Sequence, residues 1–402
     1  MPSLRLRALA LACFAFALLA PSAAAKPAEP PQPAAEAWIL IDARDGERLA
    51  ADDATDQRSI ASATKLMTAY LALRERDLDR RVPAPAYQAL AAESLLGLEA
   101  GERISYRELI YALILASAND GAVTVAEGVS GSVDRFVGKM NATAERLGLE
   151  DTSYANPIGL DEPGNYSTAA DLAKLATILL EDDFFRKVAD TEAHTVKTDR
   201  ASRPIVTRDD LLTRVPWVTG VKTGFTGEAG NVLVGAGERE GTRLIAVVLG
   251  APSEAARDDG VLSLLEYGFS LYRPEAAVRG REALADPPVD SGGTVELLAR
   301  RPVTVSVRRD QEVETAVDAP AELEGPVRRG ERLGSVEVTV DGRPAGSSPL
   351  IAARAAPAPS LGDGVRNNFP TLAVVGGALI VIVLAVVIVR RTRRVEGRGA
   401  TR

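Results

Sequence analysis

The sequence contains very little cysteine, histidine or aromatic side chain. One cysteine and one histidine occur in 402 residues, and Phe, Trp and Tyr together make up 4%. Cys13 lies in an N-terminal apolar segment, so removal of that segment would exclude disulfides, thiol catalysis and Cys-based metal clusters. His194 lies in a stretch of mixed polarity that predicts a surface strand, which disfavours a catalytic role for it. A hydrolytic serine in this chain therefore needs a base other than histidine.

The chain also lacks the basic balance that nucleic-acid binding requires. Its formal net charge is −8 and its isoelectric point is near 5.1, so nucleic acid is not an expected partner. We find no cluster of metal-ligating residues and no glycine-rich phosphate loop in the sequence. We therefore predict no metal site and no cofactor.

Long apolar runs occur only near the two ends of the chain. Arg5 and Arg7 precede the apolar stretch 8–20, and Ala23 to Ala25 match a small-residue cleavage site. This order is typical of a secretory signal peptide, predicted here over residues 1–25. An uncleaved anchor is the alternative, but the run is too short to span a bilayer.

The C-terminal run is long enough to cross a membrane. Residues 371–389 are uncharged and are followed by four arginines within the next five positions. Such a run can span the hydrocarbon core of about 30 Å, and basic residues favour the cytoplasmic flank. We expect a transmembrane helix over 369–389, a cytoplasmic tail over 390–402, and a single-pass cell-membrane protein whose preceding domains are extracytoplasmic.

Composition divides the intervening chain into two folded parts. A linker rich in Pro and Ala is predicted over 26–36 and a second linker over 354–368. Between them we predict an α+β domain over 37–276 and a small β-rich domain over 280–353, where short Val- and Thr-rich runs alternate with Gly and Pro. The elements expected in the larger domain are a hairpin over 38–51, helices over 63–73, 109–115, 122–127 and 253–272, and strands over 219–226, 231–236 and 244–249.

Three short motifs follow one another in the larger domain and together indicate nucleophilic catalysis. They are Ser62-Ala63-Thr64-Lys65 at a helix start, Ser117-Ala118-Asn119 in a turn between helices, and Lys222-Thr223-Gly224 on a strand. A serine hydroxyl is a weak nucleophile at neutral pH and needs a nearby base. Residues three apart share a helix face, so Lys65 can take the proton of Ser62. Burial and a second cation, Lys222, would favour the neutral amine.

The other two motifs supply the remaining groups for acyl transfer. We expect Ser117 to relay a proton to the leaving amine and Asn119 to hydrogen-bond the substrate amide. Lys222 and Thr223 can bind a terminal carboxylate, and Gly224 allows a peptide to approach the strand edge. Each motif alone is weak evidence, but their joint occurrence in this order is specific.

With these motifs the chain resembles the D-alanyl-D-alanine carboxypeptidases, the low-molecular-mass penicillin-binding proteins of the type-5 class. Further stretches carry the likeness: 63–68, 156–160, 166–172 and 222–226. The resemblance implies a β-lactamase/penicillin-binding transpeptidase-like domain, with an antiparallel sheet packed against helices, followed by an all-β domain. It also implies an oxyanion hole at the amides of Ser62 and Phe225. A carboxylate-binding arginine maps to Arg257.

The sequence departs from the family pattern at two places. Ala118 replaces a glycine that is common in the second motif, a change small enough to leave the turn intact. A full spanning helix replaces the amphipathic interfacial helix of the best-known members. A spanning helix would attach the protein to the membrane more firmly than an interfacial helix does. The active site would still face the same extracytoplasmic compartment as in those members.

The function that the resemblance implies is removal of the terminal D-alanine from peptidoglycan stem pentapeptides through a Ser62 acyl-enzyme. β-Lactams would be covalent inhibitors, and the expected context is cell-wall maintenance and cell shape. Three alternatives stay open: a serine β-lactamase, a penicillin-acylated sensor and a transpeptidase. The first would need a Glu with Asn four residues later, whereas Glu162 is followed by Asn165. The second would need a cytoplasmic effector, and only a short tail follows the predicted span.

Overall fold

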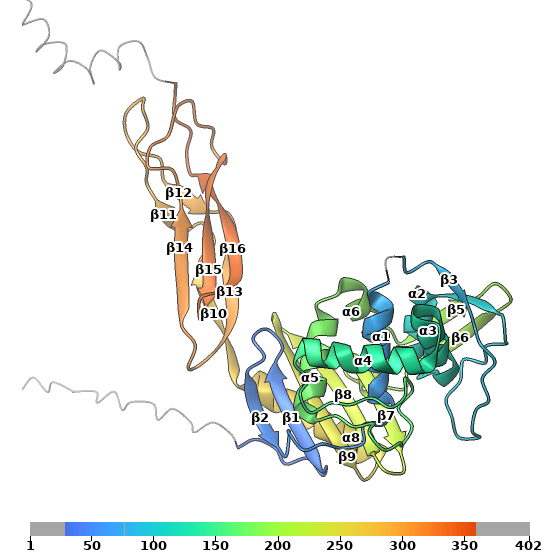
Figure 1. Cartoon of the computed structure of the whole chain (residues 1–402). Coiled ribbons are helices and arrows are strands. Elements are labelled where there is room, and N and C mark those ends of the chain that lie inside the picture. The colour runs from blue at the N-terminus through green and yellow to red at the C-terminus, as the bar shows by residue number, and fades with distance from the viewer. Residues whose placement is uncertain (1–28, 76, 359–402) are drawn as a thin grey trace, which may run out of the picture.

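The computed structural model describes residues 29–75 and 77–358, which form a helix-and-sheet body and a slender all-β body (Figure 1). The predicted signal peptide 1–25, membrane span 369–389 and tail 390–402 lie outside the described residues. In the part of the chain that the structure does describe, no helix has both the length and the apolar character to cross a bilayer.

The first body is built on a five-stranded antiparallel sheet. Its strand order is β2-β1-β9-β8-β7. The strands are β1 Ala37–Asp42, β2 Arg48–Asp52, β7 Val218–Thr226, β8 Gly230–Arg239 and β9 Thr242–Ala251. The predicted N-terminal hairpin is present, and its turn contains Gly46 at a φ of +74°, a conformation that glycine adopts without strain. Because β7 is an edge strand, one side of its backbone is open to a ligand.

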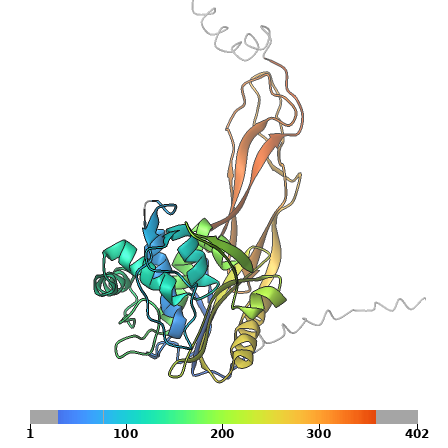
Figure 2. The ribbon, with the colours of Figure 1, turned by 90° about the vertical axis from the view of Figure 1, so that its right-hand side faces the viewer.

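Helices cover both faces of this sheet because its strands are apolar on both faces. Trp38 and Leu40 of β1 pack in a cluster with helix α8, Glu254–Ser270. Ile39 and Ile41 point to the other face, as the two-residue period of a strand requires, and join the larger core. Figure 2 shows the sheet with α8 on one side and most of the earlier helices on the other.

Most of the earlier helices fill the larger core. They are the 3₁₀ turn η1 Ala61–Thr64 and helices α1 Lys65–Leu73, α2 Tyr106–Ile114, α3 Asn119–Ser130, α4 Val133–Leu147, α5 Ala169–Leu180 and α6 Asp183–Ala189. The short helix α7 Asp210–Arg214 instead packs Leu211 in the cluster with α8. Helix α1 is buried along almost its whole length. Two short two-stranded sheets complete the body: β3 Arg81–Pro83 with β4 Arg103–Ser105, and β5 Ala193–Lys197 with β6 Ser202–Val206.

One element differs from the sequence prediction in a way that affects the site. The helix expected from residue 122 begins three residues earlier, at Asn119. Its first turn is fixed by contacts from outside the helix, because the amide of Asn119 donates to the carbonyl of Ser94 at 2.8 Å. Asn119 therefore belongs to a helix N-terminus, and its side chain is held more rigidly than in the predicted loop.

The second body is all β, as predicted from its Val-rich runs. A five-stranded sheet has the order β11-β12-β16-β15-β14, and β10 pairs with β13. The strands are β10 Tyr272–Val278, β11 Ala283–Ala285, β12 Leu297–Ala299, β13 Val303–Arg308, β14 Val313–Asp318, β15 Arg332–Val340 and β16 Arg343–Ala352. A separate core of Val, Leu and Ala side chains lies between them.

A polar cluster joins the two bodies. Arg308 of β13 pairs with Glu47 in the β1–β2 turn, and its Nη1 atom also lies 3.9 Å from the buried carboxylate of Asp42. Tyr272 donates a hydrogen bond to Asp42 at 2.6 Å. Arg343 donates to the carbonyl of Arg44 at 3.1 Å. The hairpin at the N-terminus is thus one part of the first body that the all-β body contacts.

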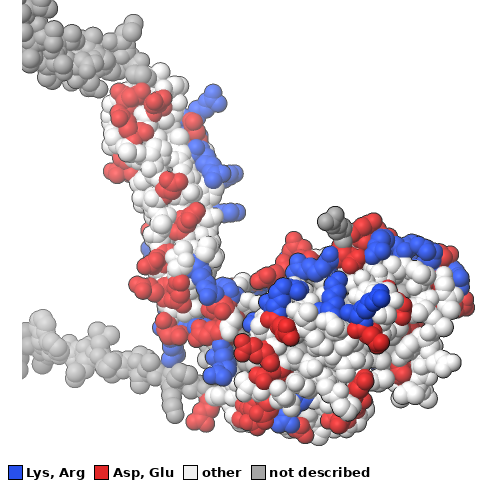
Figure 3. All heavy atoms as spheres, in the orientation of Figure 1, with Lys and Arg blue, Asp and Glu red and all other residues white. Residues whose placement is uncertain are grey.

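The surface carries charges of both signs. Figure 3 shows Asp and Glu interspersed with Lys and Arg on the visible face of both bodies. That face has no continuous basic patch of the kind that follows a nucleic-acid backbone.

Candidate active site

Ser62 and Lys65 lie together where η1 leads into α1. Nζ of Lys65 donates to Oγ of Ser62 at 3.0 Å and also donates to the carbonyl of Ile158. Lys65 is fully buried, whereas Ser62 is partly exposed. Ala61, the residue before Ser62, has a φ of +46°. This conformation is uncommon for alanine and is often found near functional residues.

The surroundings of Lys65 favour its neutral form. Burial holds the pKa of Lys65 well below its usual value, and the nearby charge of Lys222 lowers it further. The carboxylate of Glu93 acts in the opposite direction. A buried amine with a lowered pKa, within hydrogen-bond distance of a hydroxyl, can accept the proton of that hydroxyl.

The second motif lies beside the first. Ser117 is buried and has a φ of +57°, so its backbone is held in the left-handed region. It lines a cavity of about 370 Å³ that Ser62 also lines. Asn119 is 5% exposed and lies on a second cavity, of about 310 Å³, together with Ser62. Nδ2 of Asn119 donates to Glu93 at 2.7 Å.

The third motif lies on the edge strand β7, next to the nucleophile. Lys222 is buried and donates to the carbonyl of Thr223 at 2.7 Å. The pKa of Lys222 is lowered to about 7, mainly by burial and further by the charge of Arg208. A β-carbon at Gly224 would lie 2.9 Å from the amide nitrogen of Ser62. Only glycine lets this strand approach the nucleophile so closely.

A second glycine also lies very close to the backbone of η1. Gly159 has a φ of +88°, and a β-carbon there would lie 2.0 Å from the carbonyl oxygen of Ala61. Its amide donates to Oδ1 of Asn156 at 2.7 Å. The segment 156–160 therefore holds η1 in place, and the neighbouring Ile158 supplies the carbonyl that binds Lys65.

The two cavities that Ser62 lines differ in charge. One is lined by side chains of both signs, the cations Arg208 and Arg257 and the acids Asp210 and Glu254. The other is lined by Glu93, Asn119 and Asp161, with Phe225, which is 65% exposed, shared by both. Only the first cavity offers cations to an anionic substrate end, whereas the charged residues of the second are both acidic and disfavour it.

Arg257 lies at the site, but its charge is already balanced. It is 3% exposed and lines the cavity that Arg208 also lines. Its Nη2 atom lies 2.8 Å from Oδ1 of Asp258, the next residue of α8. Arg208 is exposed and, among the residues that the structure describes, has no ion-pair partner. Arg208 is therefore the more available cation for an incoming carboxylate.

The structure brings together the residues that the three motifs predicted and adds two that the sequence analysis missed. Glu93 belongs to the segment 84–98, which has no helical or strand period, and Arg208 precedes the short helix α7. Neither residue forms part of a motif. Their position at the site becomes visible only when β3, β4 and α7 are placed in space.

His194 lies outside this group, as its surface-strand prediction implied. Its Nε2 atom is 2.8 Å from Glu108, and its ring stacks on Tyr111 at a centroid distance of 3.8 Å. It lines neither of the two cavities beside Ser62.

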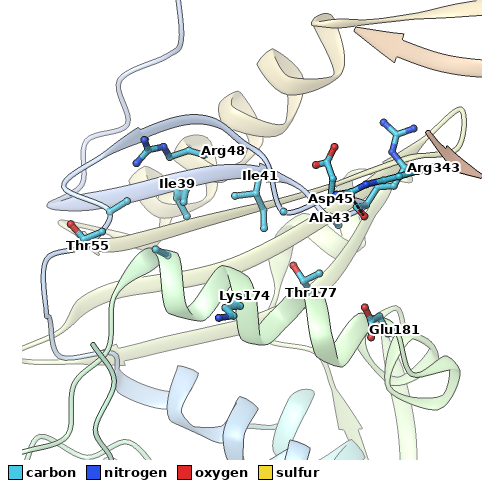
Figure 4. Close-up of a pocket in the computed structure, with 14 residues that line it drawn as sticks. Ile39, Ile41, Ala43, Asp45, Arg48, Thr55, Lys174, Thr177, Glu181 and Arg343 are labelled. Atoms are coloured by element: carbon cyan, nitrogen blue, oxygen red, sulfur yellow. Dashed lines mark hydrogen bonds between the residues drawn. The ribbon is translucent and has the colours of Figure 1, made fainter. Parts of the chain in front are cut away.

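A larger cavity, of about 720 Å³, lies elsewhere and contains none of the predicted site residues. Figure 4 shows Ile39 and Ile41 of β1 facing Lys174 and Thr177 of α5, with Arg343 of the second body at one end. Lys174 and Thr177 donate to the backbone carbonyls of Gly148 and Ala173, and no hydrogen bond joins the two side chains in the described structure. We therefore assign the chemistry to the smaller cavities at Ser62, where an amine and a hydroxyl are hydrogen-bonded.

Comparison with known proteins connects this geometry to a family. The model of the D-alanyl-D-alanine carboxypeptidase family matches residues 24–253. The model of the C-terminal domain of penicillin-binding protein 5 matches residues 285–358.

Individual relatives agree with the family match. D-alanyl-D-alanine carboxypeptidase DacF of Bacillus subtilis is 31% identical over 79% of this chain and 85% of its own length. D-alanyl-D-alanine carboxypeptidase DacC of Escherichia coli is 30% identical over 86% of this chain and 90% of its own length. Among solved structures, penicillin-binding protein 5 of Haemophilus influenzae covers 82% of this chain and 99% of its own at 26% identity, with a TM-score of 0.59. The structure of the Streptomyces K15 DD-transpeptidase covers 61% of this chain and 100% of its own at 33% identity, with a TM-score of 0.58.

Proposed function

The chain belongs to the D-alanyl-D-alanine carboxypeptidase family of serine peptidases, and from that premise we propose that Ser62 is its nucleophile and Lys65 its general base. The first body is the penicillin-binding/β-lactamase-like catalytic domain of this family, and the second is its C-terminal all-β domain. The observation that carries the proposal is the 3.0 Å contact between the hydroxyl of Ser62 and a buried amine whose pKa is lowered.

The proposed substrate is a peptidoglycan stem peptide that ends in D-alanyl-D-alanine. Its terminal carboxylate would enter the cavity lined by Thr223, Arg208 and Arg257, near Lys222. The rest of the peptide would lie along the open edge of β7 and in the cavity that contains Asn119. This placement puts the scissile carbonyl at Ser62, because both cavities share that residue.

The proposed reaction has two halves. Oγ of Ser62 attacks the carbonyl carbon of the penultimate D-alanine while Lys65 takes the hydroxyl proton. The amides of Ser62 and Phe225 would stabilise the oxyanion. The C–N bond then breaks, Ser117 relays the proton from Lys65 to the departing D-alanine amine, and an ester on Ser62 remains. Water hydrolyses this ester, which releases the shortened peptide and regenerates the hydroxyl. β-Lactams would form their own ester on the same serine, and that ester would hydrolyse slowly.

We also propose an extracytoplasmic location, with a signal peptide over 1–25 and a membrane span over 369–389. The support is the apolar and basic pattern of the two chain ends. Membrane fractionation of the full chain, compared with a chain ending at residue 358, tests this location. Recovery of both forms in the soluble fraction would exclude the anchor.

The function is tested by incubating residues 26–353 with a diacylated Lys-D-Ala-D-Ala peptide and, separately, with labelled penicillin. We expect release of D-alanine and a long-lived covalent adduct. Rapid catalytic turnover of penicillin would instead identify a β-lactamase. The likeness to a DD-transpeptidase favours one second candidate, and an added D-amino acid acceptor tests it: transfer of the acyl group to that acceptor would show transpeptidation.

A further inference from the structure

The cavity that Ser62 shares with Asn119 has an exposed apolar wall. Phe225 of β7 is 65% exposed and Leu90 of the segment 84–98 is 67% exposed, and both line this cavity. In the part of the chain that the structure describes, five large apolar side chains are exposed, and two of them lie here. Exposed apolar side chains that gather at a hollow beside a nucleophile indicate a surface that a ligand covers.

The charged side chains on this cavity are both acidic and stand outside the three motifs. They are Glu93, from the segment 84–98, and Asp161, which follows the segment 156–160. Among the described residues that line the cavity there is neither Lys nor Arg. The two basic residues nearest to the nucleophile on the surface, Arg208 and Arg257, line the other cavity.

The hydrogen bonds to Glu93 come from neutral groups. Oε2 accepts from Nδ2 of Asn119 at 2.7 Å and from the hydroxyl of Tyr87, and Oε1 accepts from the amide of Leu90 at 2.8 Å. Burial raises the pKa of Glu93, but the hydrogen bonds from Tyr87 and Asn119 outweigh burial and keep its pKa below the usual value. The side chain is thus a carboxylate at neutral pH, and no cation is paired with it in the described structure.

Asp161 is also held by neutral donors. Its Oδ1 atom accepts from the hydroxyl of Thr226 at 2.6 Å, and its Oδ2 atom accepts from the amide of Glu228 at 3.3 Å. These contacts fix the carboxylate against the end of β7, next in sequence to Phe225. An apolar surface and an unpaired negative charge therefore lie side by side in one cavity.

This combination is complementary to an aliphatic chain that ends in an ammonium group. Such side chains bury their methylene groups along apolar surface and place the charged end at a polar partner. The cavity volume of about 310 Å³ is at the small end of the range of ligand pockets. It therefore suits one side chain of the substrate, and its contact with Ser62 requires that side chain to be close to the scissile bond.

We propose that this cavity is a specificity subsite for the residue that precedes D-alanyl-D-alanine: Leu90 and Phe225 bind the aliphatic part of a diamino-acid side chain, and Asp161 and Glu93 bind its free ammonium group. This inference rests on the proposed function and names the class of stem peptide that the site prefers. The two ends of the substrate would then meet opposite charges, the ammonium group in this cavity and the terminal carboxylate in the cavity of Arg208.

Three Nα-acetylated peptides that end in D-alanyl-D-alanine test the preference with the full chain. Their first residue is lysine, norleucine or alanine, so lysine and norleucine share the aliphatic chain and only lysine carries an ammonium group. We expect kcat/KM for the lysine peptide to exceed that for the norleucine peptide about tenfold at low salt, the gain from one charge-assisted hydrogen bond. This ratio should shrink as salt is added. The norleucine peptide should exceed the alanine peptide by at least about threefold.

Variants of the two acids locate the charge effect. In Asp161→Asn and in Glu93→Gln we expect the ratio of lysine to norleucine to fall to about threefold or less. Glu93 also acts on the pKa of Lys65, but that effect is common to both peptides and cancels in the ratio. Asp210→Asn is the matched control, because Asp210 lines the other cavity of Ser62, and we expect it to keep the ratio within about twofold of the parent.

Leu90→Ala tests the apolar wall separately. Leu90 is exposed, so its truncation leaves the core intact. We expect the ratio of norleucine to alanine to fall by at least about twofold, whereas the ratio of lysine to norleucine should stay close to that of the parent. Thermal unfolding of each variant identifies any loss of folding.

The inference and the proposed function can fail independently. If the parent releases D-alanine from none of the three peptides, the function itself is wrong. If the parent is active but treats the lysine and norleucine peptides equally, the subsite is wrong. A tenfold ratio that persists in both folded acid variants would also overturn the subsite, because the charge preference would then come from other residues.

Discussion

Nζ of Lys65 lies 3.0 Å from Oγ of Ser62, and the lysine is completely buried while the serine faces two cavities. This arrangement replaces the histidine that a serine hydrolase commonly uses. Burial and the charge of Lys222 lower the pKa of Lys65, so the amine can be neutral at a pH where an exposed lysine is charged.

The pH dependence of acylation follows from this contact. Lys65 must be neutral to accept the proton, so the rate should rise as pH increases through its lowered pKa and should level off well below 10.5, the ordinary value. Lys65→Arg keeps a cation but cannot be deprotonated in this range. We expect this variant to lose at least about 1000-fold in penicillin acylation. Stopped-flow acylation of the parent and the variant from pH 5 to pH 10 checks both points, and activity of the Arg variant near that of the parent would exclude the lysine as base.

Close packing at Gly159 predicts a strong effect of a small substitution. In Gly159→Ala the new methyl group would overlap the carbonyl of Ala61, and its φ of +88° is unfavourable for alanine. We expect a loss of at least about 2 kcal/mol in the free energy of unfolding, together with slower acylation. Chemical denaturation measures the first effect.

The matched control is Gly227→Ala. A β-carbon at Gly227 has no neighbour within 4 Å, and we expect its free energy of unfolding to change by less than about 0.5 kcal/mol. Equal effects of the two substitutions would show that the close approach to Ala61 is not important.

The position of Arg208 beside Ser62 predicts a salt-dependent contribution to substrate binding. This side chain is exposed and lines the cavity that also holds Thr223 and Arg257. Arg208→Gln should raise the KM for an anionic peptide about tenfold at low salt, and the difference should shrink as salt screens the charge. Arg239→Gln is the control, because that guanidinium stacks on Trp217 away from the cavity. Equal salt dependence of the KM in the two variants would argue against a role for Arg208 in binding.

The sequence predicted the residues of the three motifs better than the other residues that line the site. Ser62 and Lys65 are three residues apart on one helical turn, so local geometry alone brings them together. The elements of the sheet were predictable for a similar reason, because β1 and β2 are close in sequence and flank a turn at Gly46. Lys222 needed recognition of its motif, since more than 150 residues separate it from Lys65.

Long-range contacts explain what the sequence could not predict. Asn119 begins α3 because its amide is held by Ser94, and Glu93 reaches the site through an irregular segment. Neither contact follows a period or a turn signal. Arg257 matched the family pattern, but its pairing with Asp258 depends on the packing of α8.

The polar junction between the two bodies predicts a contribution of Arg308 to stability. Arg308→Met keeps much of the apolar volume but removes the charge that lies near Asp42 and Glu47. Asp42 keeps its pair with Arg44 at 3.0 Å. We therefore expect a loss of roughly 2 kcal/mol in the free energy of unfolding, below the usual cost of orphaning a buried ion. Denaturant unfolding beside the exposed control Arg328→Met tests this, and equal stability of both variants would mean that the cluster does not stabilise the junction.

The most direct test of the account is to locate the covalent penicillin adduct. Tryptic cleavage after Arg58 and Lys65 releases the peptide 59–65, which contains three hydroxyl side chains at Ser59, Ser62 and Thr64. Fragmentation of this peptide by mass spectrometry should place the added mass on Ser62, and Ser62→Ala should carry none. An adduct on Ser59, on Thr64 or outside this peptide would contradict the central claim that Ser62 is the nucleophile.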